Sequence, residues 1–216
     1  FPRWDLQKFK FVSTQLGSEM KSVGEVMAIG RSFEEVLQKA IRMLDIGRNG
    51  FVYERLSEIE IEKELEKPTD KRIFFIAEAL GRGLSVDRIS EITKINKFYL
   101  YKMENIINLQ KEIESQESLN KRLIIEAKKM GFSDIQLSGF LNLEEKEIRS
   151  FRKENGISPY VKQIDTMAAE YPAKTNYLYM TYNASYNDID SGNDNQIIVL
   201  GSGAYRIGAS VEFDWC

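Results

Sequence analysis

The sequence predicts a mainly α-helical fold, and three observations support that expectation. Residues 69–156 read as a succession of short amphipathic segments, each opened by a polar residue suited to capping a helix. Glycines follow several of these segments, at positions where helices end. Strand-like runs are confined to 23–29, 177–182 and 197–200, towards the two ends of the chain.

A strand followed by a helix is expected to open the fold. Residues 23–29 alternate loosely between apolar and polar side chains, which favours a strand. Ser32 and Glu35 have the capping-box spacing that starts a helix. Apolar residues of 33–44 then recur on one helical face, and Gly47 supplies a stop.

Glutamate is concentrated between residues 57 and 67. It occupies alternate positions, namely Glu58, Glu60, Glu62, Glu64 and Glu66. Such a run could form a carboxylate cluster for metal binding or acid-base chemistry, or a solvated face. A solvated face is the more ordinary arrangement and is our interpretation.

The middle of the chain is predicted to be an all-helical bundle between residues 69 and 156. The polar residues expected to open its helices are Thr69, Ser85, Asn96, Ser118, Ser133 and Asn142. Apolar residues follow each of them at helical spacing. These helices carry more large apolar positions than a small bundle covers, so we expect the segment to associate with itself.

After Pro159 the pattern changes. Residues 160–170 can form a further helix, whereas 177–182 are rich in β-prone aromatic residues. The polar stretch 183–195 is expected to be a surface loop or linker. The apolar run 197–200 has the signature of a buried strand.

Composition excludes several classes of enzyme. The 216 residues contain no His, and the one Cys is Cys216, so Ser-His-Asp and Cys-His nucleophiles, His metal clusters and disulfides are absent. A net charge of −3 argues against a nucleic-acid partner. No apolar run is long enough for a membrane span and no signal peptide opens the chain, so we expect a cytosolic protein. The chain starts at Phe1 rather than Met, and we expect a piece of a longer protein.

Two motifs have both a functional and a plain structural interpretation. Gly201, Gly203 and Gly208 follow an apolar run, as in a turn that cradles phosphate, but the spacing also fits a turn that binds nothing. Residues 85–107 and 133–154 each resemble a helix-turn-helix. The candidate recognition helix of the second starts with three carboxylates, which would face phosphates, so plain helical packing is favoured over DNA binding.

Four blocks of sequence carry a more specific resemblance. Phe1–Trp4, Met20–Arg31, Ile164–Glu170 and Gly203–Asp214 resemble, in order, the large synthetase component of carbamoyl-phosphate synthase. The resemblance implies a helical oligomerisation domain flanked by the end of one ATP-grasp domain and by the first strand of a Rossmann-like pre-ATP-grasp subdomain.

The resemblance also implies domain boundaries. Residues 1–44 would end the first, carboxyphosphate-forming half of the synthetase. Residues 45–188 would be the oligomerisation domain and its connection, and 189–216 would begin the second, carbamoyl-phosphate-forming half. Between residues 50 and 155 the match lies in pattern more than in identity, so oligomer contacts are not carried over residue by residue.

The family makes carbamoyl phosphate from bicarbonate, ammonia and two ATP, by way of carboxyphosphate and carbamate. The resemblance places ATP and Mg outside this segment and implies no catalytic residue within it, so the isolated chain is expected to be inactive. The implied partners are the remaining ATP-grasp regions of the same chain, a separate or fused glutaminase, and further copies of the chain. Arginine and pyrimidine biosynthesis both remain open as the pathway, and a mitochondrial location is possible for the whole enzyme.

Five positions match residues that line the internal carbamate tunnel of the family: Met20, Glu25, Arg206, Ser210 and Glu212. A labile anion needs a route that excludes bulk water while offering polar contacts, which a mixture of Arg and Glu provides. An ordinary ion pair between Glu25 and Arg206 is the alternative. Ser210 replaces a Gly of the bacterial pattern, so the sequence resembles the eukaryotic-type enzymes more closely.

One competing interpretation belongs to a different class of protein. The helices could form a stand-alone binding or regulatory module, similar to a helix-turn-helix, with no catalytic role. A reading frame that continues past Cys216 into a second ATP-grasp-sized region would exclude that module.

Overall fold

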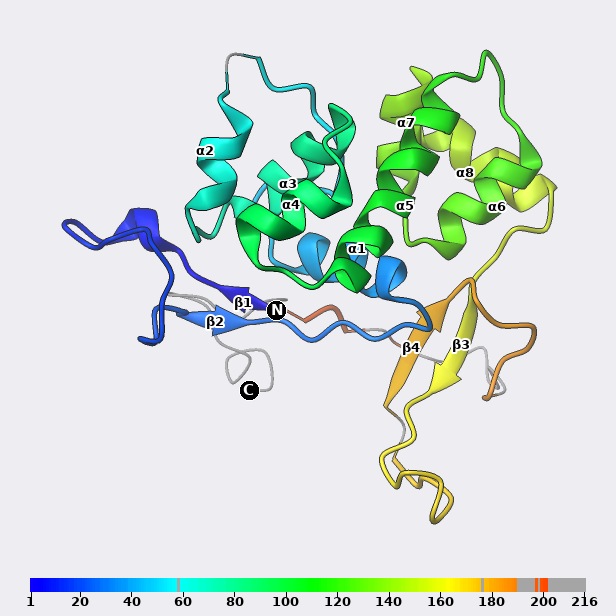
Figure 1. The fold of residues 1–216 in the computed structure, drawn as a ribbon. Helices are drawn as coiled ribbons and strands as arrows, with labels where there is room; N and C mark the ends of the chain where they lie inside the picture. The colour runs from blue at the N-terminus through cyan, green and yellow to red at the C-terminus, as the bar shows by residue number, and fades with distance from the viewer. Residues whose placement is uncertain (58, 176, 190–196, 198, 202–216) are drawn as a thin grey trace.

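The computed structural model describes residues 1–57, 59–175, 177–189, 197 and 199–201 (Figure 1). The described part is mainly helical, which confirms the predicted fold class. Its helices are α1 (Phe33–Met43), α2 (Ile61–Glu66), α3 (Arg72–Gly81), α4 (Val86–Thr93), α5 (Lys97–Glu114), α6 (Lys121–Lys129), α7 (Asp134–Leu141), α8 (Glu145–Glu154) and the short 3-10 helix η1 (Leu6–Lys8).

Two small antiparallel sheets accompany the helices. In the first, β1 (Pro2–Arg3) pairs with β2 (Gly24–Glu25), with Pro2 opposite Glu25. In the second, β3 (Tyr160–Gln163) pairs with β4 (Leu178–Thr181) to form what we call the hairpin. Both sheets lie below the helices in Figure 1, so the molecule has a helical layer above and a thin layer of strands and irregular chain beneath.

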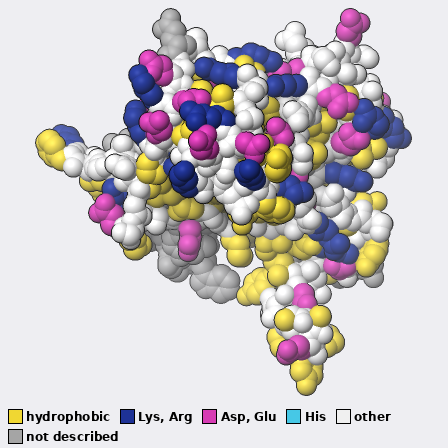
Figure 2. Space-filling model, in the orientation of Figure 1, with side chains coloured by type: hydrophobic (Ala, Val, Ile, Leu, Met, Phe, Trp, Pro, Cys, Tyr) yellow, Lys and Arg dark blue, Asp and Glu magenta, His cyan; other side chains and the backbone are white. Residues whose placement is uncertain are grey.

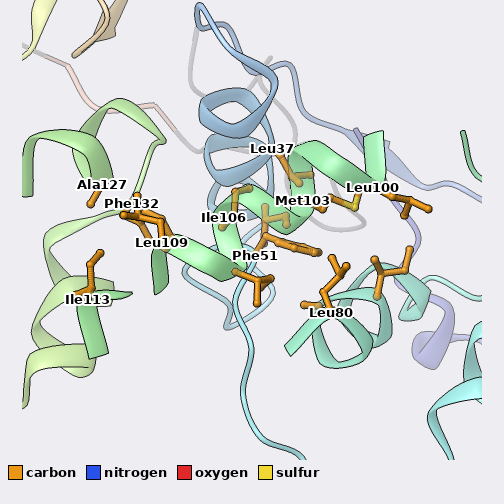
Figure 3. Close-up of a cluster of buried hydrophobic side chains, with 14 of the residues drawn as sticks. Leu37, Phe51, Leu80, Leu100, Met103, Ile106, Leu109, Ile113, Ala127 and Phe132 are labelled. Carbon is orange, nitrogen blue, oxygen red and sulfur yellow. The ribbon is translucent and has the colours of Figure 1, made fainter. Parts of the chain in front are cut away.

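The long helix α5 connects the two ends of the helical layer. It packs against α3 and α4 at one end, against α6 and α7 at the other, and against α1 below (Figure 1). Its buried apolar residues are Leu100, Met103, Ile106, Ile107, Leu109 and Ile113. All six belong to one cluster with Leu37 of α1, Leu80 of α3 and Phe132 after α6, and Figure 3 labels five of the six, all except Ile107. Each such side chain contributes about 1.5–3 kcal/mol by its burial.

Several predicted helix starts are confirmed by the capping hydrogen bonds. The side chains of Ser32, Ser85, Asn96 and Ser133 each accept a backbone N–H of the first helical turn. Other starts differ by two residues: Asn120 caps α6 in place of Ser118, and α8 follows Glu144 in place of Asn142. Asn142 instead ends α7 in the left-handed region, a conformation that Asn tolerates.

Helices α3 and α4 with the start of α5 are repeated as α6, α7 and α8. Gly83 and Gly131 have φ of 86° and 89° after the first helix of each set, and Ser85 and Ser133 cap the second. Lys94 and Asn142 are left-handed at its end and donate their N–H to the carbonyls of Ser90 and Ser138. The same sequence spacing separates every pair. The two helix-turn-helix segments seen in the sequence are thus parts of one repeated three-helix unit.

The long connection after α1 has little secondary structure, and buried side chains replace its missing backbone partners. Gln38 pairs with both backbone groups of Phe51, at 2.8 and 3.2 Å. Gln110 does the same for Tyr53, at 2.8 and 2.9 Å. The Glu78 carboxylate accepts two further N–H groups of this segment, at 2.8 and 3.1 Å. Buried backbone groups must be paired, and these side chains fix the connection against the core.

The helix expected at residues 160–170 is wrong. Residues 160–163 form β3, whose register with β4 is continuous from Tyr160 opposite Thr181 to Gln163 opposite Leu178. Beyond it, the Asp165 carboxylate accepts the N–H groups of Met167 and Ala169, at 2.9 and 2.6 Å. Local bonding of this kind competes with helix formation and produces a turn. The strand expected at 177–182 is confirmed as β4.

Two other strand predictions are corrected. The strand expected at 23–29 is limited to Gly24–Glu25, because β1 offers only two residues to pair with it. The buried strand expected at 197–200 is not seen in the described residues of that run: Ile197, Val199 and Leu200 are 92%, 82% and 90% exposed, and none of the described strands pairs with them. A strand needs a partner for its backbone, and an apolar run alone does not provide one.

The glutamate run forms a solvated helix face, as interpreted from the sequence. Ile61 and Leu65 of α2 are buried, while the carboxylates between them point to solvent and to nearby cations. Glu62 pairs with Arg88 at 2.7 Å and Glu64 with Lys67 at 3.0 Å. Glu58 lies outside the described residues. Within the described part of the chain, no group of three Asp, Glu, Cys or His residues is arranged to hold a metal ion.

Candidate functional site beneath the helices

Of the five predicted tunnel residues, Met20 and Glu25 lie among the described residues. Glu25 is an exposed residue of β2, and Met20 is 90% exposed in the segment that leads to it. Among the described residues, Glu25 forms no ion pair or side-chain hydrogen bond. Arg206, Ser210 and Glu212 lie outside the described residues, as do Gly203 and Gly208 of the glycine turn.

The N-terminal segment that supports Glu25 is anchored to the end of α1 by Arg3, which also forms a buried ion pair with Asp5. Arg3 is 7% exposed and bonds Asp5 at 3.0 Å and the carbonyl of Leu44, while Lys8 bonds Asp5 at 3.1 Å. Burial would raise the pKa of Asp5, but Lys8 and Arg3 outweigh it and hold the pKa below its ordinary value. The β1–β2 pair is thereby fixed at the C-terminal end of α1.

A buried carboxylate joins α1 to the end of the hairpin, and we call Glu35, Lys39 and Asn183 the Glu35 cluster. Glu35 is 1% exposed. Its carboxylate accepts hydrogen bonds from the Lys39 ammonium at 2.7 Å, the Asn183 amide at 3.0 Å and the N–H of Arg31 at 2.9 Å. Lys39 also donates to the carbonyls of Ile29 and Met180, at 2.8 and 2.7 Å. One helix residue pair therefore holds both the segment before α1 and strand β4.

The charge of Glu35 is stabilised despite its burial. Burial alone would raise its pKa, but the backbone N–H of Arg31, then the Lys39 ammonium and the Asn183 amide, lower it below the ordinary value. Sequence reasoning assigned Glu35 to a reciprocal capping box. In the structure Ser32 does cap the helix at 3.2 Å, whereas the Glu35 carboxylate bonds outside the cap to the hairpin.

A second ionic group joins three helices to the residue that follows β4, and we call it the Asp134 cluster. It comprises Lys128 of α6, Asp134 of α7, Arg152 of α8 and Tyr182. Lys128 bonds Asp134 at 2.9 Å, Arg152 bonds Asp134 at 2.8 Å, and Arg152 donates to the Tyr182 hydroxyl at 3.0 Å. The Lys128 ammonium also lies 5.1 Å from the centre of the Tyr182 ring.

Burial and neighbouring charges shift the pKa values of Lys128 and Asp134 in opposite directions. Desolvation lowers the pKa of Lys128, because its ammonium lies in the interior. Desolvation opposes ionisation of Asp134 too, but hydrogen bonds from Arg152 and Lys128 leave its pKa below the ordinary value. Burial raises the pKa of Tyr182, so its hydroxyl stays protonated at neutral pH. The cluster is a fixed ionic contact.

An apolar groove of about 760 Å³ lies between α1, the segment after β2 and the hairpin. Its exposed apolar residues include Met27, Met43, Tyr177, Leu178 and Met180. In Figure 2 hydrophobic side chains gather on the lower part of the visible face, over the hairpin and below the helices. Exposed apolar surface of this kind is typical of an interaction face.

A second exposed apolar patch lies at the start of α5. Phe98, Tyr99 and Tyr101 are about half exposed. The Tyr99 ring packs edge-to-face against Phe98 and at a tilt against Phe33, with ring centres 5.3 and 5.4 Å apart. We call these three exposed residues the aromatic patch. It lies on the helical layer, separate from the groove beneath it.

Sequence reasoning missed the residues that make these contacts. Lys128, Asp134 and Arg152 carry no motif, and Gln38 looks like any polar residue of an amphipathic helix. One signal was present: in the repeated unit, Lys128 and Asp134 stand where the first copy has Leu80 and Val86. A charged pair at positions that are apolar in the other copy indicates a contact specific to one copy.

None of the helices among the described residues is both long and apolar enough to cross a lipid bilayer. The site offers ionic anchors and apolar faces, and the charged side chains of the Glu35 and Asp134 clusters form bonds that join separate segments of the chain.

Comparison with known proteins agrees with that arrangement. Residues 25–156 match the family described as the carbamoyl-phosphate synthetase large chain, oligomerisation domain. The whole chain is 53% identical to the multifunctional protein pyr-3 of Neurospora crassa and covers 12% of it. It is 55% identical to the multifunctional protein ura1 of Schizosaccharomyces pombe, covering 10%.

A third relative bears the name of a synthase. The whole chain is 51% identical to the mitochondrial arginine-specific carbamoyl phosphate synthase large chain of Schizosaccharomyces pombe, and covers 19% of it. The chain thus spans between a tenth and a fifth of the length of these relatives. Since the family match takes in more than half of the residues, including all of α1 to α8, the chain belongs to the oligomerisation-domain family of carbamoyl-phosphate synthetase large chains.

Proposed function

We propose that this chain is the scaffold segment of a carbamoyl-phosphate synthase, which makes carbamoyl phosphate from bicarbonate, ammonia or glutamine, and ATP. The observation that carries the proposal is identity above 50% along the whole chain to proteins that are five to ten times longer. Mg and ATP would bind in ATP-grasp regions outside the 216 residues. Titration calorimetry of this chain with Mg-ATP should show no saturable site, and micromolar binding would contradict the proposal.

Residues 1–44 would end the first ATP-grasp half, 45–188 would form the oligomerisation domain and its connection, and 189–216 would begin the Rossmann-like part of the second half. The packing of α1 bears on the proposed boundary at residue 44. Leu37 and Ile41 of α1 belong to the same core as α5, so the first half and the helical domain would share one core across the proposed boundary at residue 44.

The groove beneath the helices would receive the rest of the same polypeptide. Met27, Tyr177 and Met180 are 75%, 62% and 57% exposed in this chain, which is unfavourable unless another surface covers them. The cations that line the groove, Lys39 and Arg42, are already bonded to Glu35 and to the carbonyl of Gly131. An apolar surface from an adjacent region of the longer chain fits such a groove better than a charged partner.

The aromatic patch would supply a contact between copies of the protein. Burying the exposed halves of Phe98, Tyr99 and Tyr101 in a symmetric interface would remove aromatic surface from water on both partners. Light scattering over a hundredfold concentration range should show association that Phe98→Ser with Tyr101→Ser abolishes. A constant monomeric mass for the unaltered chain would contradict self-association.

Met20, Glu25, Arg206, Ser210 and Glu212 are proposed to line part of the carbamate tunnel. The exposure of Glu25, and its lack of a charged partner among the described residues, supports a role towards a surface supplied by the longer chain. A Trp at position 210 would obstruct a passage without changing the ATP sites. Glu25→Gln removes the charge and keeps the shape of the side chain, so it should lower carbamoyl phosphate formation less than Ser210→Trp does.

The experiment uses the longer protein. Ser210→Trp should leave bicarbonate-dependent ATP hydrolysis intact while carbamoyl phosphate formation falls about tenfold or more, equivalent to about 1.4 kcal/mol. An equal fall in both reactions would assign Ser210 to structure, and no change in either would show that carbamate takes another route. Since a relative is named mitochondrial, cytosolic and mitochondrial locations both remain predictions.

A further inference from the structure

The repeated three-helix unit allows the two copies to be compared position by position. Leu80 and Lys128 have the same backbone role, since each carbonyl accepts the N–H of the left-handed glycine, Gly83 or Gly131, at 3.1 Å. Val86 and Asp134 are likewise the first residues after the capping serine. All four positions are largely buried, at 10% exposure or less. The first copy fills them with an apolar pair and the second with an ion pair.

An ion pair at apolar positions is not explained by stability. Removing two charges from water costs several kcal/mol per ion, and a well-packed apolar pair of similar volume is often as stable or more so. The first copy shows that the unit folds with Leu80 and Val86. The second copy therefore has an ion pair at positions where the three-helix unit itself does not require one.

The two copies differ in what they face. Around Lys128 and Asp134 lie Arg152 and the residue after β4, Tyr182, whose hydroxyl accepts Arg152 at 3.0 Å. Lys128 also donates to the carbonyl of Phe132 at 2.7 Å, so its ammonium forms two hydrogen bonds in the interior. The Lys128–Asp134 ion pair thus lies at the place where the end of the hairpin packs against the helices.

Glu35 binds Asn183, the residue that follows Tyr182 after β4. Asn183 donates to Glu35 at 3.0 Å and to the carbonyl of Lys129 at 2.8 Å, so it joins α1 to the end of α6. Two glycines leave room for this contact. A Cβ on Gly30 would lie 2.8 Å from the Glu35 carboxyl carbon, and one on Gly131 would lie 2.9 Å from the Glu35 Cα.

Beyond these residues, the chain is turned back onto the hairpin. Lys162 of β3 is 3% exposed, bonds the Asp188 carboxylate and lies 3.8 Å from the Tyr186 ring centre. The other oxygen of Asp188 accepts the N–H of Gln163 at 2.9 Å. The segment from Tyr182 to Asp188 is therefore held at both of its ends.

We propose that the Asp134 and Glu35 clusters form a two-point clamp that sets the direction in which the chain leaves the helical domain after β4. Tyr182, Asn183, Lys128, Asp134 and Arg152 act as positioning residues, and none of them touches a substrate. The consequence of the clamp rests on the proposed function: the clamp would fix the second half of the synthetase relative to the first.

The first test uses the unaltered 216-residue chain and two variants. Lys128→Leu with Asp134→Val and Arg152→Met gives the second copy the apolar pair of the first. Tyr182→Phe with Asn183→Ala removes the hairpin side of the clamp and leaves every helix residue in place. Arg122→Met is the matched control, because it removes exposed ion pairs of α6 with Glu112 and Glu126 that do not reach the hairpin.

Hydrogen exchange followed by mass spectrometry should then separate positioning from stability. In both clamp variants, amides of β4 and the residues after it should exchange about tenfold faster or more, while amides of α5 keep their protection. The Arg122→Met control should change neither. Unchanged exchange at β4 in the Tyr182→Phe, Asn183→Ala variant would overturn the clamp. So would equal acceleration in β4 and α5, since that would show loss of general stability.

The second test uses the longer protein. The Tyr182→Phe, Asn183→Ala variant should lower the carbamoyl phosphate formed per ATP hydrolysed by about twofold or more, with bicarbonate-dependent hydrolysis retained. A loosened hairpin with an unchanged ratio would overturn the positioning role. If the unaltered longer protein makes no carbamoyl phosphate, the proposed function fails, and the exchange experiment alone decides whether the clamp exists.

Discussion

Replacing Gln38 by Leu should destabilise this chain strongly, although the change is nearly isosteric and adds apolar surface. Gln38 is fully buried, and its amide pairs with the N–H and C=O of Phe51, a residue of the connection with no strand or helix to satisfy them. Leu would leave both backbone groups unpaired in the interior. Each orphaned group costs about 1–3 kcal/mol, so for the two groups we expect the free energy of unfolding to fall by about 2–6 kcal/mol.

Urea unfolding followed by far-ultraviolet circular dichroism measures this loss. The matched control is Gln116→Leu, because the Gln116 amide bonds at the surface to the carbonyl of Glu112. That change should shift the free energy of unfolding by about 0.5 kcal/mol or less. A loss below about 1 kcal/mol for Gln38→Leu would mean that water or other groups satisfy Phe51, and the account of this connection would be refuted.

Two further predictions concern the turn glycines and pH. Gly83→Ala and Gly131→Ala meet the same backbone strain, but a Cβ at Gly83 enters open space whereas one at Gly131 lies 2.9 Å from Glu35. Thermal unfolding should therefore show a loss of about 1 kcal/mol for Gly83→Ala and at least about twice that for Gly131→Ala; equal losses would contradict the close approach of α1 and the turn. The pKa values of Glu35 and Asp134 are lowered on folding, so their contribution to stability is complete above their unfolded values, near 4, and is lost as pH falls through the lower folded values. Melting temperatures measured from pH 7 to pH 2.5 should fall at the acid end, and Glu35→Gln with Asp134→Asn should flatten that fall; an unchanged acid limb would remove both carboxylates from the account.

Local patterns predicted most helices because the signals they use are local. Ser32, Ser85, Asn96 and Ser133 cap their helices through bonds within one turn, and the apolar stripes that follow them face the common core. The errors arose where a distant partner decides the structure. Residues 160–163 form a strand because β4 pairs with them. Among the described residues, no strand pairs with Ile197, Val199 or Leu200, and these three are exposed.

The candidate site was predicted far less well than the fold. The resemblance supplied Met20 and Glu25 as candidate tunnel residues, whereas the buried contacts of Lys128, Asp134 and Asn183 join residues that no spacing rule connects. The capping-box spacing of Glu35 was correct for the helix start, but the carboxylate is used 148 residues away, at Asn183. Only the spacing between the two copies of the repeated unit would have marked Lys128 and Asp134 as unusual.

The central claim is that these 216 residues work within a longer synthetase. Purifying the native polypeptide that contains them, mapping it by peptide mass spectrometry and assaying it with bicarbonate, ammonia and Mg-ATP would test that claim most directly. We expect one polypeptide with ATP-grasp regions on both sides of this segment, and we expect it to form carbamoyl phosphate. A native polypeptide no longer than the 216 residues, or a longer one that forms no carbamoyl phosphate from these substrates, would contradict it.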